Sequence, residues 1–265
     1  MTTKTQKYIY AFICFLSIAL GTTPLCAQVK RPLTDADKSA LEGVEVEKYY
    51  TYNPADAMDT LGGCLSKGAV TYRIYIDLKP GYNLQAVYGV LNHPLFIKTS
   101  TLFFNNTQYG QGTGDYVDHK KMLGSSASFD SFLTMGAASN SDMGVPKADD
   151  KDGSLIKIKS FASADGLMPA KIKPVTYFGI IPNFFNVYNP ANTFSTDNGS
   201  WAVFGGVTGA TESNKILIAQ LTTDGVLSYE LNIQVGTPSG GSVNYVAKNP
   251  QDQEIKFDAL TKAVN

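Results

Sequence analysis

The stretch Val70-Thr-Tyr-Arg-Ile-Tyr-Ile-Asp-Leu78 alternates between apolar and mostly polar side chains. In an extended chain successive side chains point to opposite faces, so the even-numbered residues share one face while Arg73 and Tyr75 share the other. A period of two is typical of a strand with one buried and one exposed face. We therefore predict a half-buried strand over 70–78.

Two turn signals predict how such strands pair. Lys79-Pro-Gly-Tyr82 separates the first strand from a second alternating run over 84–90, whose even-numbered residues form the apolar face. Thr223-Asp-Gly225 separates the runs 216–222 and 226–235, and Asp-Gly favours a tight turn because Gly tolerates positive φ. We predict a hairpin at each turn, with the odd-numbered residues of the last run on its apolar face.

These face assignments predict the effects of single substitutions. Ile74→Asp or Tyr229→Asp would place a carboxylate in the core and destabilise the fold severely. Thr71→Lys and Glu230→Lys would fall on the polar faces and be mild.

The rest of the chain adds short strands and few helices. The connectors 105–114 and 137–153 are rich in Gly, Asn, Ser and Asp. The best helix candidate is 35–41, because Thr34 can cap its N-terminus. A weaker helix candidate is 183–187. Further strands are predicted over 44–52, 95–104, 131–135, 155–160, 175–181, 201–207, 243–247 and 254–260. The pattern predicts an all-β fold, an antiparallel, jelly-roll-like β-sandwich with long surface loops.

The first 27 residues have the organisation of a secretory signal peptide. Lys4 and Lys7 precede an apolar stretch over 8–20, and a short segment then ends at Ala27. The stretch is shorter than the roughly 20 residues that a membrane-spanning helix needs, and no comparable stretch follows. We predict cleavage near Ala27, no membrane span, and a secreted or periplasmic protein. Lipid anchoring at Cys26 is disfavoured because Pro24-Leu25 precedes it where a small residue is needed.

After this signal peptide we predict an N-terminal lead-in over 28–43 and a single β-sandwich domain over 44–265. We interpret the polar segment 136–153 as a loop rather than a linker, because the strands on either side would each make a poor sheet alone. Cys64 is the one cysteine outside the signal peptide, so an internal disulfide is excluded. It is a free thiol, an intermolecular partner or, as we favour, a small buried side chain.

The charge distribution argues against nucleic acid as a partner. The chain has 22 basic and 23 acidic residues, with no block of like charges. Binding to phosphates depends on clustered Lys and Arg that release counterions, and such clusters are missing from this sequence.

Catalytic signatures are scarce. His93 and His119 lie in different segments and lack the spacing of a metal pair, and the segment around Ser239 departs from the G-x-S-x-G pattern of a hydrolase nucleophile. We therefore predict no catalytic residue, no cofactor and no metal. Paired carboxylates of a glycoside hydrolase stay an alternative, because their pairing is spatial.

Asp149, Asp150 and Asp152 before Gly153 are the strongest hint of ion binding. Asp150, Asp152 and Gly153 fit three positions of a calcium loop, but Ala148 and Lys159 stand where its first and last carboxylates belong. A solvated turn is the favoured interpretation, with a weak calcium loop as the alternative.

Aromatic residues supply the candidate binding surface. The chain is rich in Tyr, with several tyrosines beside polar residues, and such side chains can stack on sugars or contact proteins. The alternative is that they belong to the sandwich core. We predict these ligand-binding residues: Arg73, Tyr75, Tyr109, Tyr116 and Trp201.

Three stretches of the sequence together resemble one family. They are 71–89, Phe129-Asp-Ser-Phe-Leu-Thr-Met-Gly136, and 218–225 with 231–237. On these stretches the chain is similar to a secreted all-β domain of extracellular proteins of Bacteroidota. The resemblance implies an accessory module of the kind found beside sorting or adhesive domains, and it supplies no activity. The chain ends at Asn265 without a further sorting domain, so we expect periplasmic residence or release rather than surface display.

These observations lead to one expected function and two alternatives. We expect an exported, non-enzymatic binding or adhesion module that presents loops and aromatic side chains to a glycan or a cell-surface protein. The alternatives are a carbohydrate-active enzyme on a jelly-roll scaffold and a structural subunit of a surface filament or matrix.

Overall fold

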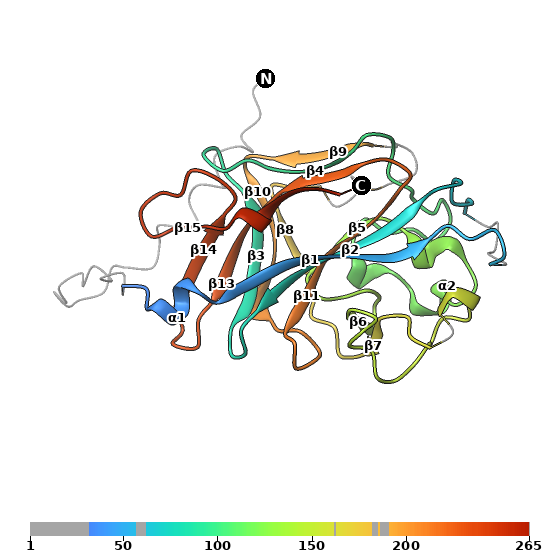
Figure 1. Cartoon of the computed structure of the whole chain (residues 1–265), viewed down its shortest axis with the longest axis horizontal. Coiled ribbons are helices and arrows are strands. Elements are labelled where there is room, and N and C mark those ends of the chain that lie inside the picture. The colour runs from blue at the N-terminus through green and yellow to red at the C-terminus, as the bar shows by residue number, and fades with distance from the viewer. Residues whose placement is uncertain (1–31, 57–61, 162, 182–184, 186–190, 265) are drawn as a thin grey trace, which may run out of the picture. The chain divides into compact units, whose positions relative to one another are not determined.

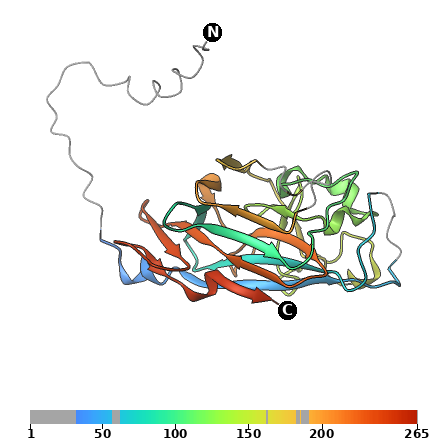
Figure 2. The same ribbon diagram turned by 90° about the horizontal axis from the view of Figure 1, so that it is seen from above.

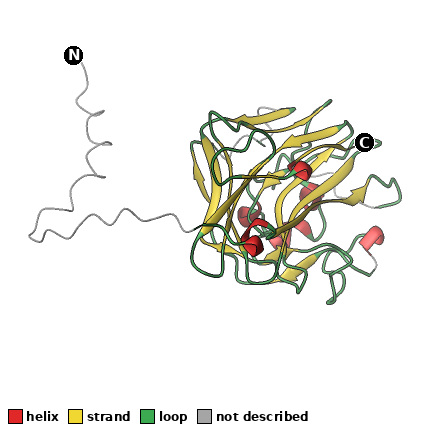
Figure 3. Ribbon diagram, turned by 60° about the vertical axis from the view of Figure 1, so that its left-hand side comes forward, coloured by secondary structure: helices red, strands yellow, loops and turns green. Residues whose placement is uncertain are grey.

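Strands make up most of the regular structure, and the helices are short (Figure 1, Figure 3). The computed structural model describes residues 32–56, 62–161, 163–181, 185 and 191–264. The predicted signal peptide over 1–27 and most of the helix candidate 183–187 lie outside these ranges. Within them, no helix is long and apolar enough to cross a membrane.

The strands of the described residues form three larger sheets and one short ribbon. Sheet one has the order β1 (Leu41–Thr51), β2 (Val70–Leu78), β11 (Lys215–Thr223), β5 (Phe132–Leu133). Sheet two has the order β15 (Ile255–Lys256), β14 (Ser242–Val246), β13 (Asn232–Gly236), β3 (Asn83–Gly89), β10 (Gly199–Val207), β8 (Thr176–Phe178). Sheet three has the order β16 (Thr261–Val264), β12 (Leu227–Glu230), β4 (Leu95–Thr99), β9 (Thr193–Thr196). The ribbon pairs β6 (Asp142–Gly144) with β7 (Leu167–Pro169).

The helical elements are single turns in the connections. The α-helices are α1 (Asp35–Lys38) and α2 (His119–Met122), and the 3-10 turns are η2 (Gly114–Tyr116), η3 (Ser126–Phe129), η4 (Lys159–Phe161) and η6 (Asp258–Leu260). The predicted cap of the first helix is confirmed: the Thr34 hydroxyl accepts the N–H of Asp37, and the Asp37 carboxylate accepts the N–H of Thr34. The strand predicted over 155–160 does not form, and η4 lies at its end.

Sheets two and three share three chain segments, which bend from one sheet into the other. β3 continues into β4, β9 into β10, and β12 into β13 across Leu231. The orders β13-β3-β10 and β12-β4-β9 correspond, so the three segments stay neighbours on both sides of the bend. The run 226–235 is therefore two strands in two sheets rather than one long strand.

Both predicted hairpins are wrong, although their strands are present. β2 pairs with β1 and β11, whereas β3 pairs with β10 and β13. β11 likewise lies in sheet one, whereas β12 after the Asp224-Gly225 turn lies in sheet three. Each turn carries the chain between sheets, because both edges of β2 and of β11 are already paired with strands distant in sequence.

The main core takes apolar side chains from all three sheets. It includes Ile74 of β2, Ile218 of β11, Val87 of β3, Ile97 of β4 and Tyr229 of β12, which are all fully buried. This core between antiparallel sheets confirms the prediction of an all-β sandwich. The compact unit begins at Leu33, inside the segment predicted as a lead-in.

The strands β2 and β11 of sheet one are buried on both faces, which corrects the prediction of a half-buried strand over 70–78. A second apolar cluster covers its other face and contains Tyr75 of β2, Leu217 of β11 and Phe129 of η3. The connectors between β4 and β7 supply much of this cover, as the green and yellow segments beside β1 and β2 in Figure 1 and Figure 2 show. These long connectors therefore form a packed layer.

Candidate functional site

Trp201 belongs to the core and not to a binding surface. It is fully buried, and its indole N–H donates to the carbonyl oxygen of Thr134 at 3.0 Å. The ring meets Phe194 edge-on, with 6.0 Å between centroids. The structure thus corrects the prediction for Trp201, whose side chain lies on the inner face of β10.

Arg73 and Tyr75 are also buried, against the prediction that they lie on an exposed face. The Arg73 guanidinium stacks on the ring of Tyr49 at 3.5 Å and donates to Gln220 Oε1 at 2.9 Å and to the Gly166 carbonyl at 2.8 Å. Burial raises the pKa of Tyr75 well above its usual range. Since neither side chain reaches solvent, both stabilise the layer over sheet one rather than offering a ligand site.

Tyr109 and Tyr116 lie on the connector between β4 and β5 and differ in exposure. Tyr116 is 68% exposed, as predicted. Tyr109 is half-buried, with the Lys121 ammonium 4.8 Å from its ring centroid. Neither residue lines the groove described below.

The calcium alternative is not supported, because Asp149 and Asp150 already accept hydrogen bonds from the protein itself. Asp150 accepts the N–H groups of Asp165 and Gly166 at 3.0 and 2.8 Å and those of Asp152 and Gly153 at 3.2 and 3.3 Å. Asp149 accepts the hydroxyl of Ser213 at 2.7 Å. The described residues contain no group of three or more His, Cys, Asp or Glu side chains that could hold a metal ion.

The two histidines pair with separate carboxylates. Buried His93 lies 2.8 Å from Glu254, and His119 Nδ1 lies 2.6 Å from Asp142. The hydroxyls of Ser139 and Ser141 also donate to Asp142. Because these serines bond to the carboxylate and not to the imidazole, the cluster lacks the serine–histidine contact of a nucleophilic triad.

Cys64 is a free and exposed thiol. The expectation that it would be a small buried side chain is therefore wrong. The paired glycines before it, Gly62 and Gly63, adopt positive φ values of 85° and 106° in an irregular segment that leaves Cys64 at the surface.

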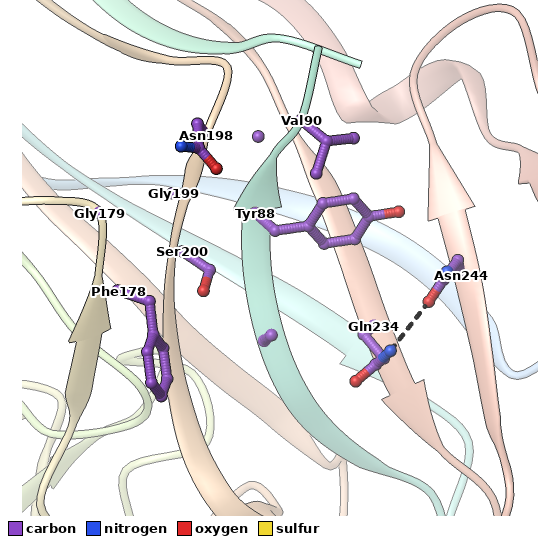
Figure 4. A pocket seen from close by; sticks show the side chains of 11 residues that line it. Tyr88, Val90, Phe178, Gly179, Asn198, Gly199, Ser200, Gln234 and Asn244 are labelled. Atoms are coloured by element: carbon purple, nitrogen blue, oxygen red, sulfur yellow. Dashed lines mark hydrogen bonds between the residues drawn. The ribbon is translucent and has the colours of Figure 1, made fainter. Parts of the chain in front are cut away.

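The candidate site is a groove of about 470 Å³ on the outer face of sheet two, which we call the outer groove. It crosses β14, β13, β3, β10 and β8 (Figure 4). Its lining residues are Ala86, Tyr88, Gly89, Val90, Phe178, Gly179, Asn198, Gly199, Ser200, Gln234 and Asn244. The predicted ligand-binding residues are not among them.

Strand register explains why these side chains meet. Ser200 lies opposite Tyr88 on one side and opposite Phe178 on the other, and Gln234 lies opposite both Ala86 and Asn244. Residues that face one another across neighbouring strands point to the same face of a sheet. The lining is therefore two rows of cross-strand neighbours.

A β-bulge decides which side chains of β3 face the groove. Gln234 pairs with Ala86 but Val235 pairs with Leu84, so Gln85 is an extra residue on β3. Leu84 and Val87 both point into the core as a result, and Ala86 and Tyr88 point outward. The predicted apolar face of 84–90 is therefore wrong beyond Leu84.

The groove has a floor of small side chains between aromatic and amide-bearing sides. Ser200 lies between Phe178 on one side and Tyr88 and Gln234 on the other (Figure 4), and Ala86 is the second small side chain of the lining. The Tyr88 hydroxyl is buried without a hydrogen-bond partner in the described residues, so its ring is the part that faces the groove. Burial, with a contribution from the Glu254 carboxylate, raises the pKa of Tyr88.

The amide groups retain capacity for a ligand. Gln234 Nε2 donates to Asn244 Oδ1 at 3.3 Å, which leaves Gln234 Oε1 and Asn244 Nδ2 without partners in the described residues. The side-chain amide of Asn198 and the hydroxyl of Ser200 have no partner there either. The lining thus offers donors and acceptors together with aromatic carbon.

Exposed apolar side chains cluster around this groove. Phe178 is 48% exposed and Val90 43%, and Phe204, whose ring contacts Phe178, is 82% exposed. Leu91 and Ile181, which follow lining residues in the chain, are 81% and 76% exposed. A concentration of exposed apolar side chains on one surface marks an interaction site. Phe204, a large aromatic residue directly before Gly205-Gly206, could have pointed to this surface. Because β10 has apolar residues on both faces, the sequence did not indicate which face is exposed.

Comparison of the chain with protein-family models, with curated proteins and with solved structures gave no match. The candidate function therefore rests on the groove itself.

Proposed function

We propose that the protein is an exported binding module whose outer groove holds a neutral glycan. The observation that carries this proposal is the composition of the groove: its lining combines exposed Phe178 with the side-chain amides of Gln234, Asn244 and Asn198 and has no charged side chain. Export rests on the signal-peptide pattern of residues 1–27, and it stays a prediction, as does the resemblance to secreted domains of Bacteroidota.

The chemistry of sugars fits such a lining. A pyranose ring has faces of C–H groups that pack on aromatic rings, and hydroxyls that both donate and accept hydrogen bonds. Phe178 and the ring of Tyr88 supply aromatic carbon. Side-chain amides offer donor and acceptor on one group, which suits hydroxyl pairs.

The lack of charge supports binding rather than hydrolysis at this groove, and neutral rather than anionic ligands. A glycoside hydrolase needs two carboxyl groups across the scissile bond. Among the described residues that line the groove there is no Asp, Glu or His. A carboxylate or sulfate placed there would lose water without meeting a cation.

The test is binding of the full chain, expressed with its own leader, to immobilised xylan, cellulose, mannan, laminarin and the anionic polygalacturonate. We expect a neutral polysaccharide to bind, and Phe178→Ala to weaken binding about five- to tenfold through loss of an aromatic contact. Tyr116→Ala is the matched control, since it removes an exposed aromatic ring outside the groove.

Three outcomes would count against the proposal. Binding of none of the neutral glycans contradicts it, and so does equal binding by wild type and Phe178→Ala. Capture of a surface protein through the same groove, without glycan binding, would favour the adhesion alternative instead.

A further inference from the structure

The outer groove is longer than one sugar ring. It crosses five strands, from β14 to β8. Four inter-strand spacings of about 4.8 Å give a trough of about 19 Å. A single pyranose would occupy a fraction of this length, and the rest of the lining would stay in contact with water.

The lining changes in character from one end to the other. Asn244 and Gln234 form an amide-rich end, Ser200 lies in the middle, and Phe178 forms the aromatic end (Figure 4). Ala86 also belongs to the middle, because β3 lies between β13 and β10. The small middle residues leave room for a ligand to lie flat across the strands. The groove can therefore be filled by one extended ligand better than by several unrelated small ones.

Phe204 extends the aromatic end beyond the groove. It lies on β10, and its ring meets Phe178 edge-to-face at 6.4 Å between centroids and 86° between planes. The Phe204 side chain is 82% exposed, so the aromatic end is open to solvent. Because β10 lies inward of the edge strand β8, a ligand that reaches Phe178 would contact Phe204 by turning along β10.

We infer that the outer groove binds an internal stretch of a linear, neutral polysaccharide laid across the strands of sheet two, with one or more sugar units continuing over Phe204. This inference rests on the proposed function and specifies its ligand class. The amide end orients hydroxyls, and the Phe178–Phe204 pair contacts the ring faces of units further along the chain. Affinity should therefore grow with the number of sugar units.

The experiment measures the affinity of the full chain for oligosaccharide ladders, from monosaccharide to hexasaccharide, prepared from xylan, cellulose, mannan and laminarin. We expect affinity to rise at least tenfold between the disaccharide and the longest oligomers of the ladder that binds. Phe204→Ala should lose about tenfold for the long oligomers and leave the disaccharide unchanged. Gln234→Ala should weaken short and long oligomers alike.

The outcomes separate this inference from the proposed function. A monosaccharide that binds as tightly as the hexasaccharide overturns the inference and leaves glycan binding intact, as does unchanged long-oligomer affinity in Phe204→Ala. Failure of every ladder to bind contradicts both. Leu102→Ala, which removes a 54% exposed apolar side chain outside the groove, is the control for nonspecific loss of surface hydrophobicity.

Discussion

At the residue scale, Arg73 illustrates why the type of a side chain did not reveal its position. It is fully buried, although a charge costs free energy to bury. The cost is offset by the hydrogen bonds to Gln220 and Gly166 and by the ring of Tyr49. All these partners are distant in sequence, so the alternation of 70–78 correctly predicted two faces and could not show that both are covered.

The same burial reverses the sequence-based expectation for Thr71. Its side chain is fully buried, with its hydroxyl 2.7 Å from that of Thr222. We now expect Thr71→Lys to destabilise by several kcal/mol, because an unpaired ammonium would enter the layer over sheet one. Thr193→Lys, on an exposed position of β9, is the control and should change little.

Urea unfolding of the two variants measures this difference. Similar midpoints for Thr71→Lys and Thr193→Lys would show that the face of β2 carrying Arg73 is open to water. The sequence also predicted that Glu230→Lys would be mild. In the structure Glu230 is nearly buried and pairs with Lys248, so the substitution would place a second ammonium beside Lys248.

At the element scale, bulges determine what sheet two presents to solvent. The extra residue at Gln85 turns Tyr88 outward, and β10 has its own irregularity between Ala202 and Val207. Gly205 and Gly206 lie within that irregularity at φ values of 76° and 71°. This backbone is strained for residues with a side chain, and it follows directly after Phe204.

The two glycines give a matched pair of substitutions. A Cβ on Gly205 would meet nothing within 4 Å, whereas a Cβ on Gly206 would overlap the Asn83 side chain and approach the Leu84 carbonyl at 3.1 Å. Gly205→Ala should cost about 1–2 kcal/mol from positive φ alone. Gly206→Ala should cost clearly more, as measured by denaturant unfolding; equal costs would contradict the close approach of β3 at this bulge.

At the scale of the whole molecule, the long connectors behave as part of the core. Every residue from 125 to 139 is buried, although few of them belong to a strand. Their N–H groups reach distant strands: Thr134 donates to Ile218 at 2.9 Å and Gly136 to Leu217 at 2.7 Å. Sheet one thus lies between the sheets of the sandwich and a layer of irregular chain.

Hydrogen exchange tests this arrangement. Amides within 125–139 that donate to β11 should exchange as slowly as those of β11 itself, because opening them requires exposure of the second apolar cluster. The exposed segment 248–253 should exchange fast. Rapid exchange throughout 125–139 would show that the connectors are surface loops after all.

The sequence by itself determined the all-β class, the capped first helix, and most of the strands, with 70–78 correct to the residue. These features depend on local periodicity and on turn or capping chemistry, which neighbouring residues encode. The outer groove was not predictable in this way. It needed Phe178, Ser200, Tyr88 and Gln234 to become neighbours across four strands.

Only the tertiary structure decided which strands pair, which faces are covered and where the outer groove lies. The Asp224-Gly225 turn has the chemistry of a hairpin, yet β11 already has β2 and β5 as partners, so the chain continues into another sheet. Pairing is a competition among all strands, and a bulge of one residue reverses every side chain that follows it. The exposed face of sheet two, and the outer groove on it, are products of that competition.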